Sequence, residues 1–196
     1  MKSVKRFFIK SIRRVCRSGG YGIHSPFAFD FVTNVVYNPL PYYFFTGAAK
    51  ALPFTVSEKQ RKMGELLFRI VEHYKLSAVV TPREQYTVLT AYAAAPSSAI
   101  KLYDIKSVKP FPLPALFLFD NNTTKEEWEE FYKEIKDSMP EGSVVAITDI
   151  QENREKNALW NELYLDLTAS ALFDLYDIGI VFLQKGLHKK RYIVSY

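Results

Sequence analysis

The chain contains no glycine between Gly64 and Gly142, and this gap limits what the fold can bind. Within the gap, the apolar run at residues 77–81 (SAVVT) is typical of the first buried strand of an α/β sheet. The turn after such a strand is a common nucleotide site, because glycine there lets the backbone approach a ligand closely. Here that turn begins Thr81, Pro82, Arg83, and proline fixes φ and removes a hydrogen-bond donor. We therefore expect a nucleotide-binding architecture without its glycine loop.

The same turn has a purely local explanation. Thr81 and Glu84 have the spacing of a capping box, and Pro82 suits the first helical position. This pattern predicts that the strand leads directly into a helix that ends near Ala95. A ligand is not needed to account for these residues.

The composition is that of a globular chain of one ordinary domain. It has 196 residues, of which 48% are hydrophobic and 24% charged, enough to form a substantial core. The single Cys16 excludes an internal disulfide framework and a cysteine-based zinc cluster, which favours a reducing, cytoplasmic setting.

No apolar stretch reaches the roughly 18 residues of a membrane span. The run Phe7–Ile9 is also too short for a signal peptide.

The positive charge is concentrated in one short arm. Residues 1–29 contain seven of the 26 basic side chains and no acidic one. The rest of the chain then has 19 basic and 21 acidic side chains. This distribution argues against a broad nucleic-acid-binding face and for a local basic element.

Two features of the first 45 residues suggest a partner surface. Residues 3–17 have the pattern of a basic amphipathic helix, which either attaches to an anionic membrane, a protein or RNA, or packs on the domain as an accessory helix. Ser25 and Pro26 predict a helix from Pro26 to about Tyr37, and His24 beside this cap suits a structural hydrogen bond. Residues 38–45 are rich in proline and aromatic side chains, and they either wrap over the domain or line a pocket or partner surface.

Beyond residue 56, helices and strands alternate. Helices are predicted from Ser57 to about Tyr74, from Thr123 or Thr124 to about Ser138, and over residues 152–166. The predicted strands are residues 78–81, 99–104, 115–119, 143–148, 172–177, 180–184 and 191–195, with a hairpin about Gly179. We expect an N-terminal accessory segment, residues 1–56, and one α/β unit, residues 57–196. Its fold is a doubly wound, mostly parallel, Rossmann-like sheet with an antiparallel edge hairpin.

Two segments carry a resemblance to a known family. Residues 22–27 (GIHSPF) follow the basic segment, and residues 144–150 (VVAITDI) precede a Trp160-containing helix and residues 174–182 (DLYDIGIVF). In these segments and in its strand–helix order, the chain resembles the class I S-adenosylmethionine-dependent methyltransferases. More narrowly, it is similar to a bacterial set related to the O-methyltransferases, seen largely in Bacteroidetes.

The resemblance implies cofactor-binding positions. Asp104, at the end of the second strand, matches the acid that binds the cofactor ribose. Asp120 matches the acid that meets the methionine amino group or a metal ion. Thr81 stands where the family has its glycine loop. Asp149 matches a metal-ligand acid, although Ile150 follows it where an amide would help. Strand-end capping is the alternative role for Asp104 and Asp120.

These observations lead to two functional hypotheses. The first is a methyltransferase-fold protein that has lost S-adenosylmethionine binding, has no catalytic residue and acts as a binding or scaffold module through residues 1–45. Its partner is a protein or an anionic membrane surface. The second is an active O-methyltransferase on a small molecule, with an atypical cofactor loop. Other enzyme classes find little support, since the chain has no phosphate loop, no Gly-x-Ser-x-Gly motif and no metal-type histidine pair.

Overall fold

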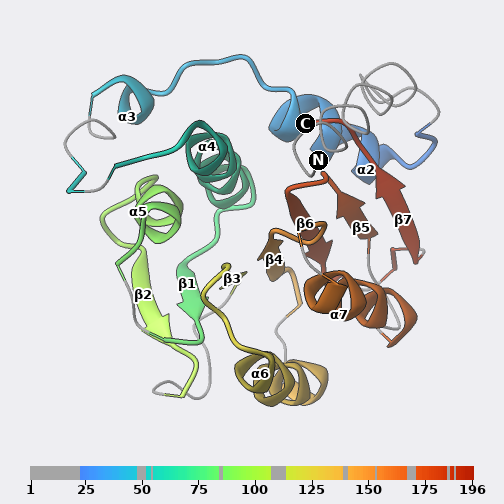
Figure 1. The fold of residues 1–196 in the computed structure, drawn as a ribbon. Coiled ribbons are helices and arrows are strands. Elements are labelled where there is room, and N and C mark those ends of the chain that lie inside the picture. The colour runs from blue at the N-terminus through green and yellow to red at the C-terminus, as the bar shows by residue number, and fades with distance from the viewer. Residues whose placement is uncertain are drawn as a thin grey trace, which may run out of the picture.

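Seven strands form one sheet in the order β2-β1-β3-β4-β6-β5-β7 (Figure 1). Their bounds are β1 Ala78–Thr81, β2 Lys101–Asp104, β3 Ala115–Phe119, β4 Val144–Thr148, β5 Ala171–Asp174, β6 Ile178–Phe182 and β7 Lys190–Ile193. All strands run parallel except β6, which is antiparallel to both β4 and β5. The computed structural model describes residues 23–47, 52–53, 55–83, 86–106, 114–138, 141–152, 154–166, 171–184, 186–187 and 189–196. The predicted basic helix at residues 3–17, with Cys16, lies outside these residues.

Helices cover both faces of the sheet (Figure 1). One face carries α2 (Pro26–Asp30), the π-helix η1 (Phe31–Val36), α4 (Glu58–His73) and α5 (Val88–Ala94), and the other carries α6 (Lys125–Ser138) and α7 (Arg154–Asp166). The side chains of β3 alternate between the two cores: Leu116 and Leu118 face the first group of helices, and Phe117 and Phe119 face the second. The predicted α/β class with a mostly parallel sheet is thus confirmed, and the arrangement is compatible with a Rossmann-like fold.

The helix starts follow local capping chemistry. Ser57 caps α4, since its side chain accepts from the Gln60 N–H (3.2 Å) and the Gln60 side chain accepts from the Ser57 N–H (3.1 Å). At α6, Thr124 rather than Thr123 forms the reciprocal pair, with Glu127. These bonds satisfy N–H groups that the first helical turn leaves without partners.

The predicted helix start at Thr81 is wrong. The Thr81 hydroxyl donates to the Arg83 carbonyl (2.6 Å) and closes a tight turn. The helix α5 begins only at Val88, because Thr87 and Thr90 form a second capping box further along the chain. The cap of α5 therefore forms at Thr87 and not at Thr81.

The predicted helix from Pro26 to Tyr37 changes type along its length. After one turn of α-helix it continues as the π-helix η1, where the Tyr37 N–H donates to the Val32 carbonyl (3.0 Å). The buried Arg69 of α4 donates from Nε to the Val35 carbonyl (2.8 Å). Phe31 packs on Phe173 and Phe182, so this helix forms part of the domain core.

The predicted hairpin about Gly179 is also wrong in detail. Its turn lies at residues 175–177, where Tyr176 has a φ of 72° and its N–H donates to the buried Asp174 carboxylate (3.0 Å). Gly179 lies within β6, and a Cβ there would come within 2.5 Å of the Trp160 ring. The hairpin is not at the sheet edge either, because β7 pairs with the outer side of β5 in parallel.

Candidate functional site

The carboxyl ends of β1, β3 and β4 lie side by side at one edge of the sheet. From β1 the chain passes through α5 to β2 on one side and returns to β3 on the other side. This reversal makes the gap between β1 and β3 the topological switch point, where doubly wound sheets bind their ligands. The candidate site is therefore at this edge.

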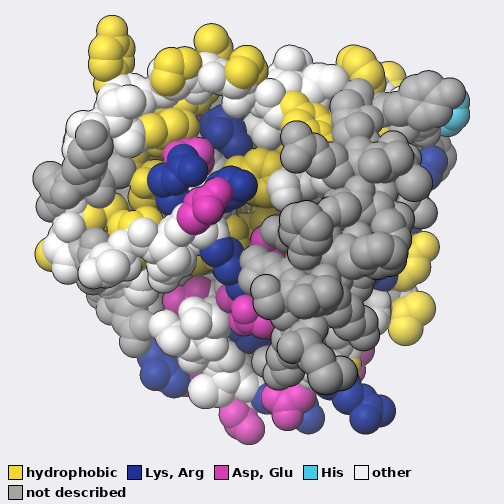
Figure 2. Space-filling model, turned by 45° about the horizontal axis from the view of Figure 1, so that its top comes forward, with side chains coloured by type: hydrophobic (Ala, Val, Ile, Leu, Met, Phe, Trp, Pro, Cys, Tyr) yellow, Lys and Arg dark blue, Asp and Glu magenta, His cyan; other side chains and the backbone are white. Residues whose placement is uncertain are grey.

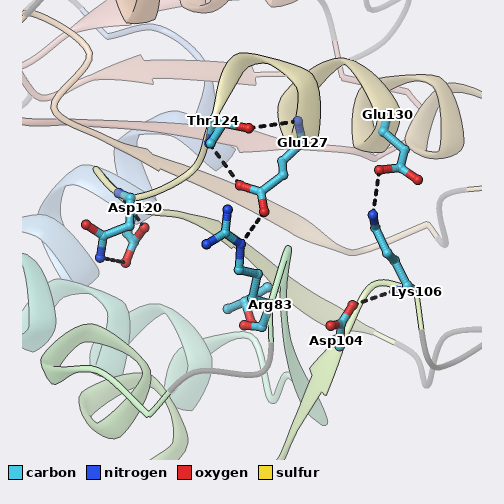
Figure 3. Close-up of polar contacts among 9 residues, drawn as sticks. Arg83, Asp104, Lys106, Asp120, Thr124, Glu127 and Glu130 are labelled. Atoms are coloured by element: carbon cyan, nitrogen blue, oxygen red, sulfur yellow. Dashed lines mark hydrogen bonds and ion pairs between the residues drawn. The ribbon is translucent and has the colours of Figure 1, made fainter.

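An ion pair spans the switch point. Arg83, just after β1, donates from Nε to Oε1 of Glu127 on α6 (Figure 3). The other oxygen of Glu127 accepts from the Thr124 N–H (2.9 Å), so the carboxylate is also part of the α6 cap. Burial raises the pKa of Glu127, but hydrogen bonds from Thr124 and Arg83 outweigh burial and lower that pKa below its ordinary value. The remaining cavity measures about 20 Å³, room for one water molecule.

Each of the three predicted cofactor residues lies at this edge, and each makes a bond within its own turn. Thr81 and Asp104 are register partners at the ends of β1 and β2. The Asp104 carboxylate accepts from the Lys106 N–H (2.7 Å), and Asp120 accepts from the Asn122 N–H (2.8 Å; Figure 3). Thr81 and Asp120 line the switch-point cavity. Their role toward a cofactor stays a prediction.

A larger cleft opens beside the switch point. It has a volume of about 350 Å³, within the usual range for small-molecule sites. It lies between the starts of α4 and α5 and the ends of β3 and β4. Its lining consists of Ser57, Lys59, Gln60, Met63, Thr87, Val88, Leu89, Asp120, Asn121, Asn122, Thr148, Asp149 and Glu152.

A lysine and two acids connect α4 to the end of β4 across this cleft. The Lys59 ammonium contacts Asp149 and lies 2.8 Å from Glu152 Oε1. Burial lowers the pKa of Lys59, but the bonds to Asp149 and Glu152 outweigh it and raise the pKa above its ordinary value. Lys59 is therefore a charged part of the cleft wall.

A second lysine lies behind the cleft. Lys156 of α7 donates from Nζ to the Asp120 carbonyl (3.1 Å). Burial lowers the pKa of Lys156, and attraction to Asp149, Asp120 and Glu152 opposes this shift. The cleft and its surroundings thus contain charges of both signs.

Sequence reasoning identified Asp120 and Asp149 here but missed Lys59, Glu152 and Thr148. One signal was available for Lys59. In an α/β fold, a helix that precedes a strand ends next to the amino end of that strand and runs antiparallel to it. The first turn of the helix therefore lies near the carboxyl ends of the strands. The residues Ser57 to Gln60 could have been placed beside the strand ends on that basis.

The expectation of a metal role for Asp149 finds little support in the geometry. The Asp149 carboxylate is in contact with the Lys59 ammonium. Among the described residues, no group of three or more His, Cys, Asp or Glu side chains could hold a metal ion.

A search of family models, of curated proteins and of solved structures finds no match to this chain.

Proposed function

We propose that this chain is a non-catalytic binding protein on a methyltransferase-type fold that has lost S-adenosylmethionine binding. The observation that carries the proposal is the Arg83–Glu127 ion pair across the switch point. The motifs at residues 22–27 and 144–150 suggest the family. The reversal of strand order between β1 and β3 is in keeping with a nucleotide-binding ancestor.

The small cavity among the described residues of the switch point supports the loss of cofactor binding. Ligand pockets have volumes of about 300–1,000 Å³, whereas this cavity has about 20 Å³. Opening it requires breaking the ion pair of Arg83 and shifting Glu127, which also caps α6. Pro82 in addition supplies no N–H to a ligand.

The alternative is an active O-methyltransferase with an atypical cofactor turn. Methyl transfer depends mainly on alignment of the reactants, so the chain needs no catalytic motif for it. In this alternative, Asp104 exchanges its bond to the Lys106 N–H for the cofactor ribose. The cofactor must also displace Arg83.

Calorimetric titration of the intact chain with S-adenosylmethionine and S-adenosylhomocysteine separates the two readings. We expect no saturable heat at millimolar ligand. Micromolar binding that Asp104→Ala weakens at least about tenfold (about 1.4 kcal/mol) would overturn the proposed loss of cofactor binding and favour the alternative. Asp30→Ala serves as the control, since Asp30 pairs with His73 at the far end of α4.

The described part of residues 1–45 has the exposed apolar surface that a binding module needs. Tyr43 is 98% exposed, Leu40 63% and Phe29 49%. Figure 2 shows hydrophobic side chains gathered along the upper edge of this face, while basic and acidic side chains intermingle near its centre. Among the described residues, no helix is long and apolar enough to cross a membrane. On the strength of the exposed apolar side chains and the basic residues of the arm, we assign residues 1–45 to a protein partner or to an anionic membrane surface.

A further inference from the structure

We propose that residues 39–43, here called the 39–43 segment, dock on an anionic membrane surface, with Leu40 and Tyr43 inserted into the lipid. The inference rests on the proposed function, because it names the partner of the binding surface assigned to residues 1–45. Three features of the molecule carry it: the exposure of the segment, the packing that holds it, and the charge around it.

The 39–43 segment presents apolar side chains to solvent. Leu40 is 63% exposed and Tyr43 98%, and Pro39 and Pro41 are exposed as well. Here the chain passes from η1 to α3 (Tyr43–Thr46) along the upper side of the molecule, above α4 (Figure 1). Exposed leucine and tyrosine side chains suit a membrane interface, where leucine enters the acyl region and tyrosine lies at the level of the headgroups.

Aromatic packing sets the direction of Tyr43. Three of its neighbours contact the ring of Phe68 on α4, with ring centroids between 4.8 and 5.8 Å apart: Tyr42, Phe44 and Phe45. The aromatic residues on either side of Tyr43 therefore face the domain, while Tyr43 faces solvent. The two prolines of the segment fix φ at their positions, which stiffens the chain before α3. A surface that is already ordered loses little conformational entropy when it binds.

The chain around the segment carries very little charge. Lys50 is the single charged residue among residues 31–57. Two acids of α4, the helix on which α3 packs, each pair with a base one turn away: Glu58 with Lys62 (3.2 Å) and Glu65 with Arg61 (2.7 Å). Insertion of the 39–43 segment into lipid therefore desolvates no charged side chain of its own.

The basic arm makes an anionic membrane the partner that fits best. All seven basic residues of the arm lie within the first 17 positions, and Asp30 is the first acid of the chain. Membrane binding at an interface grows with the buried apolar area and with attraction to anionic lipid, and this end of the chain supplies both. A protein partner needs a complementary surface of about 800 Å², whereas lipid accommodates a narrow apolar segment of any shape.

Co-sedimentation of the full chain with phosphatidylcholine vesicles, with and without phosphatidylserine, tests the proposal. We expect binding to the phosphatidylserine vesicles and at least about tenfold weaker binding to pure phosphatidylcholine. Leu40→Ser and Tyr43→Ser are each expected to weaken binding to the anionic vesicles about tenfold, because burial of one apolar side chain is lost. No binding to the anionic vesicles would overturn the proposal and leave this surface to a protein partner.

Leu165→Ser is the matched control. Leu165 is 76% exposed on α7, on the opposite face of the sheet from α4 (Figure 1), and its substitution is expected to leave vesicle binding unchanged. All these variants replace exposed side chains, so their midpoints of urea unfolding should stay close to that of the parent chain. Equal losses of binding in Leu40→Ser and Leu165→Ser would contradict the assignment.

Tyr43→Trp places a fluorescent reporter in the segment. The native Trp128 and Trp160 are 3% and 0% exposed, so their emission is expected to stay constant. The emission of the Tyr43→Trp chain should shift to shorter wavelength when anionic vesicles are added, and that of Leu165→Trp should not. Binding without this shift would show that the segment is not inserted, and would overturn the proposal. A shifted emission before vesicles are added, together with a dimeric mass, would assign the segment to a second copy of the chain instead.

This proposal and the proposed function can fail separately. S-adenosylmethionine is titrated into the same preparation without vesicles. If it binds at micromolar concentration, the proposed loss of cofactor binding fails, whatever the vesicles show. If neither the cofactor nor the vesicles bind, only the membrane surface fails.

Discussion

At the scale of single residues, the informative groups are buried polar atoms that have no hydrogen-bond partner among the described residues. Thr148 Oγ1 is such an atom, buried in a residue that borders the candidate cleft, and the Tyr74 hydroxyl is another, at the end of α4. Burial raises the pKa of Tyr74 well above its ordinary value of 10.0, and the charge of Asp30 adds to the shift. Above pH 10 the unfolded chain therefore loses this proton while the folded chain keeps it. The free energy of unfolding consequently falls as the pH rises.

We expect Tyr74→Phe to raise the free energy of unfolding by about 1 kcal/mol at pH 7 and to reduce its decline above pH 10. Urea unfolding at several pH values measures both effects. Tyr196→Phe is the control, because the Tyr196 hydroxyl accepts from Arg69 (3.0 Å) and donates to the Lys62 carbonyl (2.7 Å). Its loss should destabilise the protein. A Tyr74→Phe protein as unstable as Tyr196→Phe would contradict this account.

At the scale of elements, the last glycine before the long gap has a packing role. A Cβ on Gly64 of α4 would come within 2.7 Å of the ring of Tyr92 on α5, which is 1% exposed. Phe44 and Phe45 of α3 (Tyr43–Thr46) pack on the same tyrosine. Gly64 therefore permits the close contact of α4 and α5.

Gly64→Ala is expected to lower the free energy of unfolding by about 1 kcal/mol. Overpacking costs about 1–3 kcal/mol, and the gain in helix propensity returns about 1 kcal/mol. Gly47→Ala is the control, since a Cβ there has its nearest contact at 3.6 Å. Urea unfolding of both variants checks the prediction, and a stabilised Gly64→Ala protein would refute it.

Elements with one dominant local signal could be predicted from the sequence. The Ser57–Gln60 capping box and the apolar run of β3 gave correct positions, because no neighbouring pattern competed with them. The start of α5 was predicted wrongly, because Thr81 heads the capping-box pattern, whereas the cap forms between Thr87 and Thr90, where the sequence has no Glu or Gln. The candidate site was only half predictable. Asp120 and Asp149 follow strands directly, but the contact of Lys59 with Asp149 depends on how α4 lies across the sheet.

At the scale of the whole molecule, charge divides the chain into two parts. Seven basic side chains and no acidic one occur in residues 1–29, and the remainder has 19 basic and 21 acidic side chains. Deletion of residues 1–18 should abolish association with vesicles that contain anionic lipid, or with a protein partner, because the attraction of the basic arm is lost. Co-sedimentation of the full chain and of the deletion variant with anionic and with zwitterionic vesicles measures the effect. The two proteins are compared only if their midpoints of unfolding are the same. Unchanged association would refute a binding role for the arm.

The central claim is that the chain does not bind S-adenosylmethionine at the switch point. The most direct measurement is a two-dimensional amide NMR spectrum of the ¹⁵N-labelled chain at millimolar S-adenosylmethionine. We predict that the amide signals of Thr81, Arg83 and Asp104 stay in place. Saturable shifts of these three signals would contradict the account, because they would show the cofactor bound at the switch point.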